Sequence, residues 1–123
     1  MKPLTEEWLR KAEEDYRVAK REMEADPPSF NAVCFHAQQC VEKYLKAVLQ
    51  ENGIAFQKIH DLEVLLDQCL EFVPKLEKLR EDAQTLNVFA VEVRYPGFEA
   101  QQKDAKQALS SMKTMVEVVK GYF

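Results

Sequence analysis

The chain is poor in the residues that break helices and make turns. Only three of its 123 residues are glycine and five are proline, while 46% are hydrophobic and 31% are charged. These proportions exclude collagen-like and disordered chains, and they favour long helices joined by short turns. Because this length is typical of one domain, we expect a single domain over residues 1–123.

Long apolar runs and paired cysteines are missing too. No stretch approaches the roughly 20 apolar residues that span a bilayer, and Met1 to Thr5 lead into charged residues instead of an apolar signal segment. We therefore expect a cytoplasmic protein that does not enter the membrane. The three cysteines, Cys34, Cys40 and Cys69, lack metal-site or disulfide spacing. This predicts reduced thiols, no metal site and no cofactor.

The chain also lacks an excess of positive charge. Its formal net charge is −4 and its pI is about 5.3, which argues against non-specific coating of nucleic acid, because neutralising phosphates needs a basic face. A local basic pocket remains compatible with this balance. Glycine-rich phosphate loops and the GxSxG elbow are absent, which removes the commonest sequence signals of nucleotide hydrolases and serine hydrolases.

What is present is hydrophobic periodicity of the helical kind along most of the chain. Five patterns are separated by turn signals, at residues 5–25, 29–52, 61–69, 74–95 and 98–123. Thr5, Ser29 and Asp61 are the predicted N-caps. Pro74 is expected to open the fourth helix, and Gly53 to end the second in the left-handed conformation.

The apolar arc of the second pattern is wider than the stripe of an ordinary surface helix. We therefore expect this helix at the centre, with a neighbour on each side. The sequence predicts an all-α fold, an antiparallel up-and-down bundle of four long helices plus a short third helix across one end.

Polar residues that could bind a ligand recur along the fourth pattern. Arg80, Asn87 and Arg94 are spaced by seven, so they form one line beside the buried stripe. Arg94 could present its guanidinium to a phosphate or carboxylate, while Tyr95 offers a ring for stacking. The alternative is an ordinary ion pair between Arg94 and a carboxylate such as Asp15.

The second pattern carries another group of polar residues. His36, Gln39 and Lys43 lie within a narrow arc and could offer a base, an amide and a cation to one ligand. A solvated polar face with an i, i+4 pair between Glu42 and Lys46 explains the same residues.

Two further residues have simpler interpretations. His60 precedes the predicted cap Asp61, so a role in ordering the loop accounts for it better than catalysis does. Phe35 is a large aromatic residue among charged ones, which indicates a second contact surface.

The segment from Phe35 to Leu49 reads FHAQQCVEKYLKAVL and resembles the second-helix signature of the HEPN domain, the nucleotide-binding domain of higher eukaryotes and prokaryotes. Weaker similar features stand in the right order around it: Trp8 with Ala12, Glu14 and Asp15; His60-Asp61-Leu62; and Arg94-Tyr95-Pro96. The resemblance covers nearly the whole chain. It implies four long helices plus a short one, commonly paired as a homodimer. It also implies a minimal nucleotidyltransferase partner, in a substrate-binding system or a toxin-antitoxin pair.

Another branch of the HEPN family consists of metal-independent ribonucleases. Their motif is an Arg followed after four to six residues by His. Arg94 matches the Arg, but the positions for the His hold Glu99, Ala100 and Gln101. Loss of this general acid or base would cost a rate factor of about 10² to 10⁴. His36 could substitute only if the second helix brings it beside Arg94.

The leading prediction is thus a non-catalytic HEPN-type binding module for a nucleotide or another phosphate-bearing group. The predicted lining of its cleft is Gln39, Lys43, Asn87, Arg94 and Tyr95. Two alternatives stay open. One is a ribonuclease toxin that cleaves RNA with Arg94 and either His36 or another proton carrier, and the other is a pure interaction module whose polar residues pair across a dimer.

Overall fold

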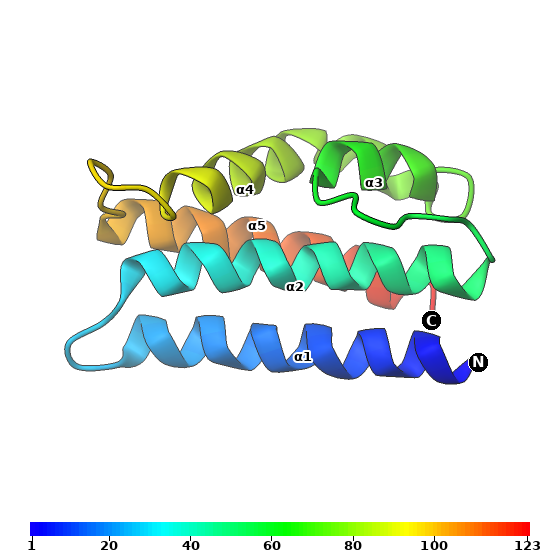
Figure 1. The fold of residues 1–123 in the computed structure, drawn as a ribbon, viewed down its shortest axis with the longest axis horizontal. Coiled ribbons are helices and arrows are strands. Elements are labelled where there is room, and N and C mark those ends of the chain that lie inside the picture. Colours follow the sequence, from blue (N-terminus) through cyan, green and yellow to red (C-terminus); the bar gives the residue numbers. More distant parts are fainter.

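Four long helices run alternately up and down, and a short helix lies over one end of the second of them (Figure 1). The computed structural model describes residues 1–123 and contains no strand. The elements are α1 Pro3–Glu24, α2 Phe30–Glu51, α3 Leu62–Cys69, the 3₁₀ helix η1 Pro74–Leu79, α4 Arg80–Glu92 and α5 Gln102–Lys120. The predicted all-α antiparallel bundle is therefore confirmed. None of these helices combines the length and the apolar character that crossing a bilayer requires.

Helix α2 lies at the centre of the bundle, as its wide apolar arc predicts. It packs against α1, α3, α4 and α5, and the buried apolar side chains join into one cluster of 28 residues. Its largest buried side chains include Tyr44, Leu45 and Leu49. Because α2 has neighbours on nearly every side, its polar residues are also drawn into contacts with other helices.

Local signals place most helix ends correctly. Ser29 Oγ accepts a hydrogen bond from the N–H of Ala32, and Asp61 Oδ1 accepts from the N–H of Glu63 at 2.8 Å, so both predicted N-caps are confirmed. Gly53 has φ 68°, the left-handed conformation predicted after α2. The N-cap prediction for Thr5 is wrong, because α1 already begins at Pro3, where a proline suits the first turn.

The second half of the chain departs from the predicted boundaries. Pro74 opens η1, which leads directly into α4, so the predicted fourth helix is part 3₁₀ and part α. Helix α4 ends at Glu92, and Arg94 lies in the following turn. Helix α5 begins at Gln102, later than predicted, because the N–H of Gln101 donates to Asp104 Oδ2 at 2.8 Å and fixes the start there.

Candidate functional site

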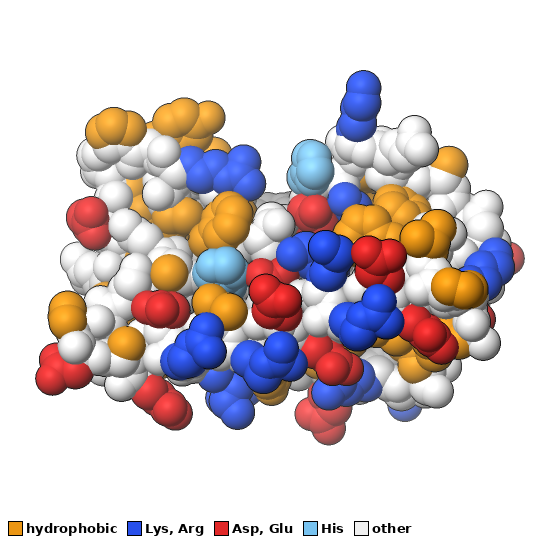
Figure 2. Space-filling model, turned by 60° about the horizontal axis from the view of Figure 1, so that its bottom comes forward, with side chains coloured by type: hydrophobic (Ala, Val, Ile, Leu, Met, Phe, Trp, Pro, Cys, Tyr) orange, Lys and Arg blue, Asp and Glu red, His pale blue; other side chains and the backbone are white.

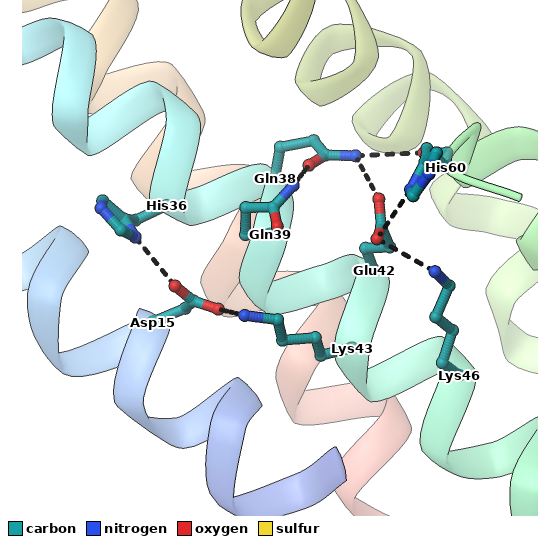
Figure 3. Close-up of polar contacts among 8 residues, drawn as sticks. All are labelled: Asp15, His36, Gln38, Gln39, Glu42, Lys43, Lys46 and His60. Atoms are coloured by element: carbon teal, nitrogen blue, oxygen red, sulfur yellow. Dashed lines mark hydrogen bonds and ion pairs between the residues drawn. The ribbon is translucent and has the colours of Figure 1, made fainter. Parts of the chain in front are cut away.

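Two edges of α2 carry polar side chains toward different neighbours (Figure 3). His36 and Lys43 are seven residues apart, which places them on one line of the helix, facing α1. Gln38, Glu42 and Lys46 follow at intervals of four and form a second line, facing the loop before α3. The polar residues of the central helix therefore belong to two separate clusters.

The first cluster, which we call the Asp15 cluster, contains Asp15, His36 and Lys43 and joins α1 to α2. His36 Nδ1 lies 2.8 Å from Asp15 Oδ1, and Lys43 Nζ contacts Asp15 Oδ2. A carboxylate taken out of water needs such partners, since an unpaired buried charge is costly. The proposed ion pair between Asp15 and Arg94 is therefore wrong, because both oxygens of Asp15 are taken by residues of α2.

The second cluster, which we call the Glu42 cluster, contains Gln38, Glu42, Lys46 and His60. Lys46 Nζ lies 3.1 Å and His60 Nδ1 3.2 Å from Glu42 Oε2, while Gln38 Nε2 donates to Glu42 Oε1 at 3.2 Å. The side chains of Glu42 and Lys46 are each only 6% exposed. The expected i, i+4 pair thus exists, but it is buried and not part of a solvated face.

Aromatic rings close the far side of the Glu42 cluster. Lys46 Nζ lies 5.5 Å from the ring centroid of Trp8 and 5.8 Å from that of Phe56, distances at which a cation interacts with a ring face. The two rings also meet edge to face at 5.6 Å. Trp8 therefore packs against the ammonium of Lys46.

A small hollow opens beside the Glu42 cluster, between α2 and α4. It has a volume of about 250 Å³ and is lined by Gln38, His60, Asp61, Asn87, Ala90, Val91 and Arg94. We call it the Arg94 hollow. Figure 2 shows one face of the molecule, on which both histidines (pale blue) appear and the outline is notched beside one of them.

Arg94 differs from the other arginine of its predicted line. Arg80 pairs with three carboxylates, those of Glu63, Asp67 and Glu77, and these hydrogen bonds raise its pKa. Arg94 has no carboxylate partner, and its guanidinium carbon lies 5.4 Å from the ring centroid of Phe35. Phe35 therefore supports a guanidinium whose N–H groups remain available to a ligand.

Asn87 links α4 to the residues just before α3 at one edge of the hollow. Its Oδ1 accepts from the N–H of Leu62 at 2.9 Å, and its Nδ2 donates to Asp61 Oδ1 at 2.9 Å. Asp61 thus receives hydrogen bonds both from Asn87 and from the first turn of α3. These bonds hold the loop that carries His60 against α4.

The five predicted ligand-binding residues are divided by this geometry. Asn87 and Arg94 line the hollow. The other three are not among its lining residues: Gln39 donates to Gln38 Oε1 at 2.8 Å, Lys43 belongs to the Asp15 cluster, and Tyr95 is 64% exposed.

Three polar residues of the hollow were not predicted as ligand contacts: Gln38, His60 and Asp61. The spacing of Gln38, Glu42 and Lys46 on one line of α2 could have indicated Gln38, but no local pattern indicates that His60 and Asp61 join it. His60 does help to order its loop, since its carbonyl oxygen accepts from Gln38 Nε2 at 3.2 Å.

None of the cysteines is a hydrogen-bond partner in either cluster or lines the hollow. All three are buried, and burial, the largest cause, raises the pKa of Cys34 and of Cys69 to about 12 and raises that of Cys40 as well. Thiols in this state are poor nucleophiles. No group of three or more His, Cys, Asp or Glu side chains converges as metal ligands would.

The bundle and its hollow place the chain among small helical modules in which a central helix borders a polar pocket. Comparison with known families identifies which family of such modules it belongs to. The sequence profile of the HEPN domain matches residues 5–122. The chain therefore belongs to the HEPN domain family, and the resemblance carried by residues 35–49 is confirmed.

Individual relatives agree with this assignment. The chain is 29% identical over 131 residues to "Putative toxin MJ1304" of Methanocaldococcus jannaschii, which covers 94% of this chain and 85% of the relative. The crystal structure of TT1696 from Thermus thermophilus matches with a TM-score of 0.84 at 23% identity, over 97% of this chain and 98% of that one. ST0689, described as an archaeal HEPN homologue, matches with a TM-score of 0.74 at 23% identity, over 98% of both chains. These two structures support the fold.

Proposed function

We propose that the chain is a HEPN-type binding module whose Arg94 hollow takes the phosphate of a nucleotide or another phosphate-bearing group. The observation that carries the proposal is the position of Arg94, a guanidinium at the edge of a hollow with no carboxylate to neutralise it. A guanidinium presents paired N–H donors that match the geometry of phosphate oxygens. Asn87 and Gln38 add amide groups beside it.

The negative charges near the hollow are largely engaged elsewhere. Asp61 Oδ1 accepts from the backbone of α3 and from Asn87, at the N-terminus of a helix where negative charge is favoured. Glu42 is paired with the ammonium of Lys46. Arg94 is the one Lys or Arg side chain that lines the hollow, and no carboxylate forms an ion pair with it, which supports an anionic ligand.

Calorimetry can test this binding directly. We expect AMP or ATP to bind saturably, and Arg94→Ala to weaken binding by about tenfold or more, the value of one charge-assisted hydrogen bond. Arg21→Ala is the matched control, since Arg21 is exposed at the end of α1. Absence of heat with every common nucleotide, also with the partner protein present, would contradict the proposal.

The proposed partners are a second copy of the chain and a minimal nucleotidyltransferase, both implied by the family. Phe35 supports dimerisation less than expected, because Arg94 and His36 partly cover it. Better support comes from Val88, Val91 and Tyr95, which are exposed on one side of the C-terminal end of α4. We expect light scattering to give a dimer mass, and Val91→Glu to lower it to that of the monomer.

A second candidate function is the ribonuclease toxin, and the description of the relative from Methanocaldococcus jannaschii as a putative toxin supports the toxin part of it. In its predicted form, Arg94 acts with His36 or another proton carrier. His36 Nδ1 is held by Asp15, and its side chain is not part of the lining of the Arg94 hollow. This candidate therefore needs another group to carry the proton. The pure interaction module is distinguished by Arg94→Ala, which would then change dimer stability and no ligand affinity.

A further inference from the structure

Helices α1 and α5 border a groove on the surface of the bundle. Both helices pack on α2 and run antiparallel (Figure 1), while the contact between the two of them is slight. The space between them has a volume of about 380 Å³ and is lined by Tyr16 of α1 and by Lys113, Val116, Glu117 and Lys120 of α5. We call it the α1–α5 groove. It shares no lining residue with the Arg94 hollow.

The apolar residues of the groove, Tyr16 and Val116, each belong to an apolar line along their helix. Leu9 and Met23 stand seven residues before and after Tyr16, and all three are half-buried against the core. Leu109 stands seven residues before Val116, and both are nearly buried. Residues seven apart lie on one line of a helix, about 10.5 Å apart. The groove thus has the repeat of a seam on which another helix can pack.

A row of lysines borders this seam on the α5 side. Lys106, Lys113 and Lys120 are exposed and are also spaced by seven. None of them takes part in an ion pair within the chain. From the α1 side, Lys20 Nζ lies 5.7 Å from the ring centroid of Tyr16, and Lys120 Nζ lies 6.0 Å from the same ring. The groove therefore carries unpaired positive charge in a protein whose net charge is −4.

The occupant that fits this pattern is a helix with acidic side chains. Carboxylates spaced by seven on such a helix lie about 10.5 Å apart, as the lysines of α5 do, and apolar residues with the same repeat meet the floor of the groove. A nucleic-acid strand fits less well. Glu117 lines the groove between Lys113 and Lys120 in the sequence, and its carboxylate would repel a continuous row of phosphates.

We infer that the α1–α5 groove binds an amphipathic helix of a partner protein. The apolar residues of this helix pack on Tyr16 and Val116, and its carboxylates pair with Lys106, Lys113 and Lys120. The apolar contact supplies most of the affinity, while the charges select the partner and its register, as charges beside a coiled-coil seam do. The inference does not depend on phosphate binding in the Arg94 hollow, so either can fail without the other.

A synthetic peptide of about three heptads is the probe. It carries leucine at the two seam positions of each heptad and glutamate at the positions beside the seam, where repulsion keeps it from pairing with itself. The peptide is labelled with fluorescein and titrated with the full chain while its anisotropy is measured. We expect saturable binding that weakens as NaCl is raised, because exposed ion pairs are screened. The same peptide with lysine in place of glutamate should bind at least about tenfold more weakly.

Charge reversal in the protein tests the assigned lysines. Lys113→Glu should weaken binding of the glutamate peptide by about fivefold or more, because an ion pair is replaced by a repulsion. Lys78→Glu is the matched control, since it makes the same change of charge at an exposed residue of η1, and it should alter binding by less than about twofold. The triple variant K106E/K113E/K120E should prefer the lysine peptide, a reversal that a loss of stability would not produce.

Two results would overturn the inference: no binding of the glutamate peptide, or equal binding of both peptides. In the first case, a single-stranded RNA oligonucleotide that binds the chain but not Lys113→Glu would assign the lysines to nucleic acid instead. A lower mass of Lys113→Glu than of the unchanged chain in light scattering would instead assign the groove to contact between copies of the chain.

Discussion

The Asp15 cluster and the Glu42 cluster contain the same kinds of groups. Each has a buried carboxylate joined to one histidine through Nδ1 and to one lysine (Figure 3). They differ in what lies around the histidine. His36 is 30% exposed and its ring packs against Phe35, whereas His60 is 72% exposed and borders the Arg94 hollow. One carboxylate-histidine pair therefore joins two helices, and the other faces an open space.

The exposure of the two lysines differs in the opposite direction from that of the two histidines. Lys43 is 23% exposed, whereas Lys46, whose ammonium lies against the rings of Trp8 and Phe56, is only 6% exposed. The cluster with the more accessible histidine thus has the more deeply buried ammonium. The buried pair of Glu42 and Lys46 contacts the exposed imidazole of His60. Such a buried support suits a side chain that must be positioned accurately.

The largest expected effect comes from removing the buried ammonium. Lys46→Met leaves the charge of Glu42 buried without its lysine, so we expect the free energy of unfolding to fall by about 3 kcal/mol. Lys43→Met is the control, with an expected loss of about 1 kcal/mol or less, because Asp15 keeps His36 and water reaches Lys43. Urea denaturation followed by circular dichroism measures both. Equal losses would mean that the two lysines are buried to the same extent in solution.

A smaller loss is expected when the edge of the hollow is opened. Asn87→Ala removes the acceptor for the N–H of Leu62 and a donor to Asp61, which should lower the free energy of unfolding by about 1 to 2 kcal/mol. Gln84→Ala on the same helix is exposed and should change it by less than about 0.5 kcal/mol. If both variants unfold at the same urea concentration, Asn87 does not hold the loop before α3.

Substitutions of the two histidines should change the free energy of unfolding by still smaller amounts. We expect His36→Gln to lower the free energy of unfolding by about 1 kcal/mol, because it weakens the buried contact with Asp15. His60→Gln should cost less than about 0.5 kcal/mol, since most of its side chain is in water. The same urea titrations decide this, and a larger loss for His60→Gln would give that residue a mainly structural role.

The smallest effect concerns the thiols. Cys40 lies on α2 near both Asp15 and Lys43, and burial raises its pKa. We expect no alkylation by iodoacetamide of Cys34, Cys40 or Cys69 in the folded protein at pH 8, and complete alkylation in urea, as mass spectrometry can show. Rapid labelling of native Cys40 would indicate that water reaches the Asp15 side of α2.

Much of the fold was predictable because its signals are local. Ser29 and Asp61 cap helices through bonds to residues two or three positions away, and Gly53 needs only its own backbone freedom. Thr5 was misread for the same reason, because it has the residue type of a cap. Its hydroxyl instead donates to Glu51 of α2 at 2.9 Å, a contact that depends on how two helices pack.

The candidate site was predictable only in part. Arg94 and Asn87 were identified from their place beside the buried stripe of the fourth pattern, and both line the hollow. His60 was read as a loop residue because nothing near it in the sequence indicates Arg94. The distance between them along the chain is closed by α3 and η1, whose packing no local pattern specifies.

The sequence by itself determined that the chain forms antiparallel helices with a wide-faced helix at the centre, because periodicity and capping act over a few residues. Spacing along a helix also sets the direction in which each side chain points around the helix axis. Only the tertiary structure decided which neighbouring residue lies in that direction. Lys43 meets the carboxylate of Asp15 on α1, whereas Lys46 meets Glu42 and the rings of Trp8 and Phe56, although the two lysines are separated by less than one turn.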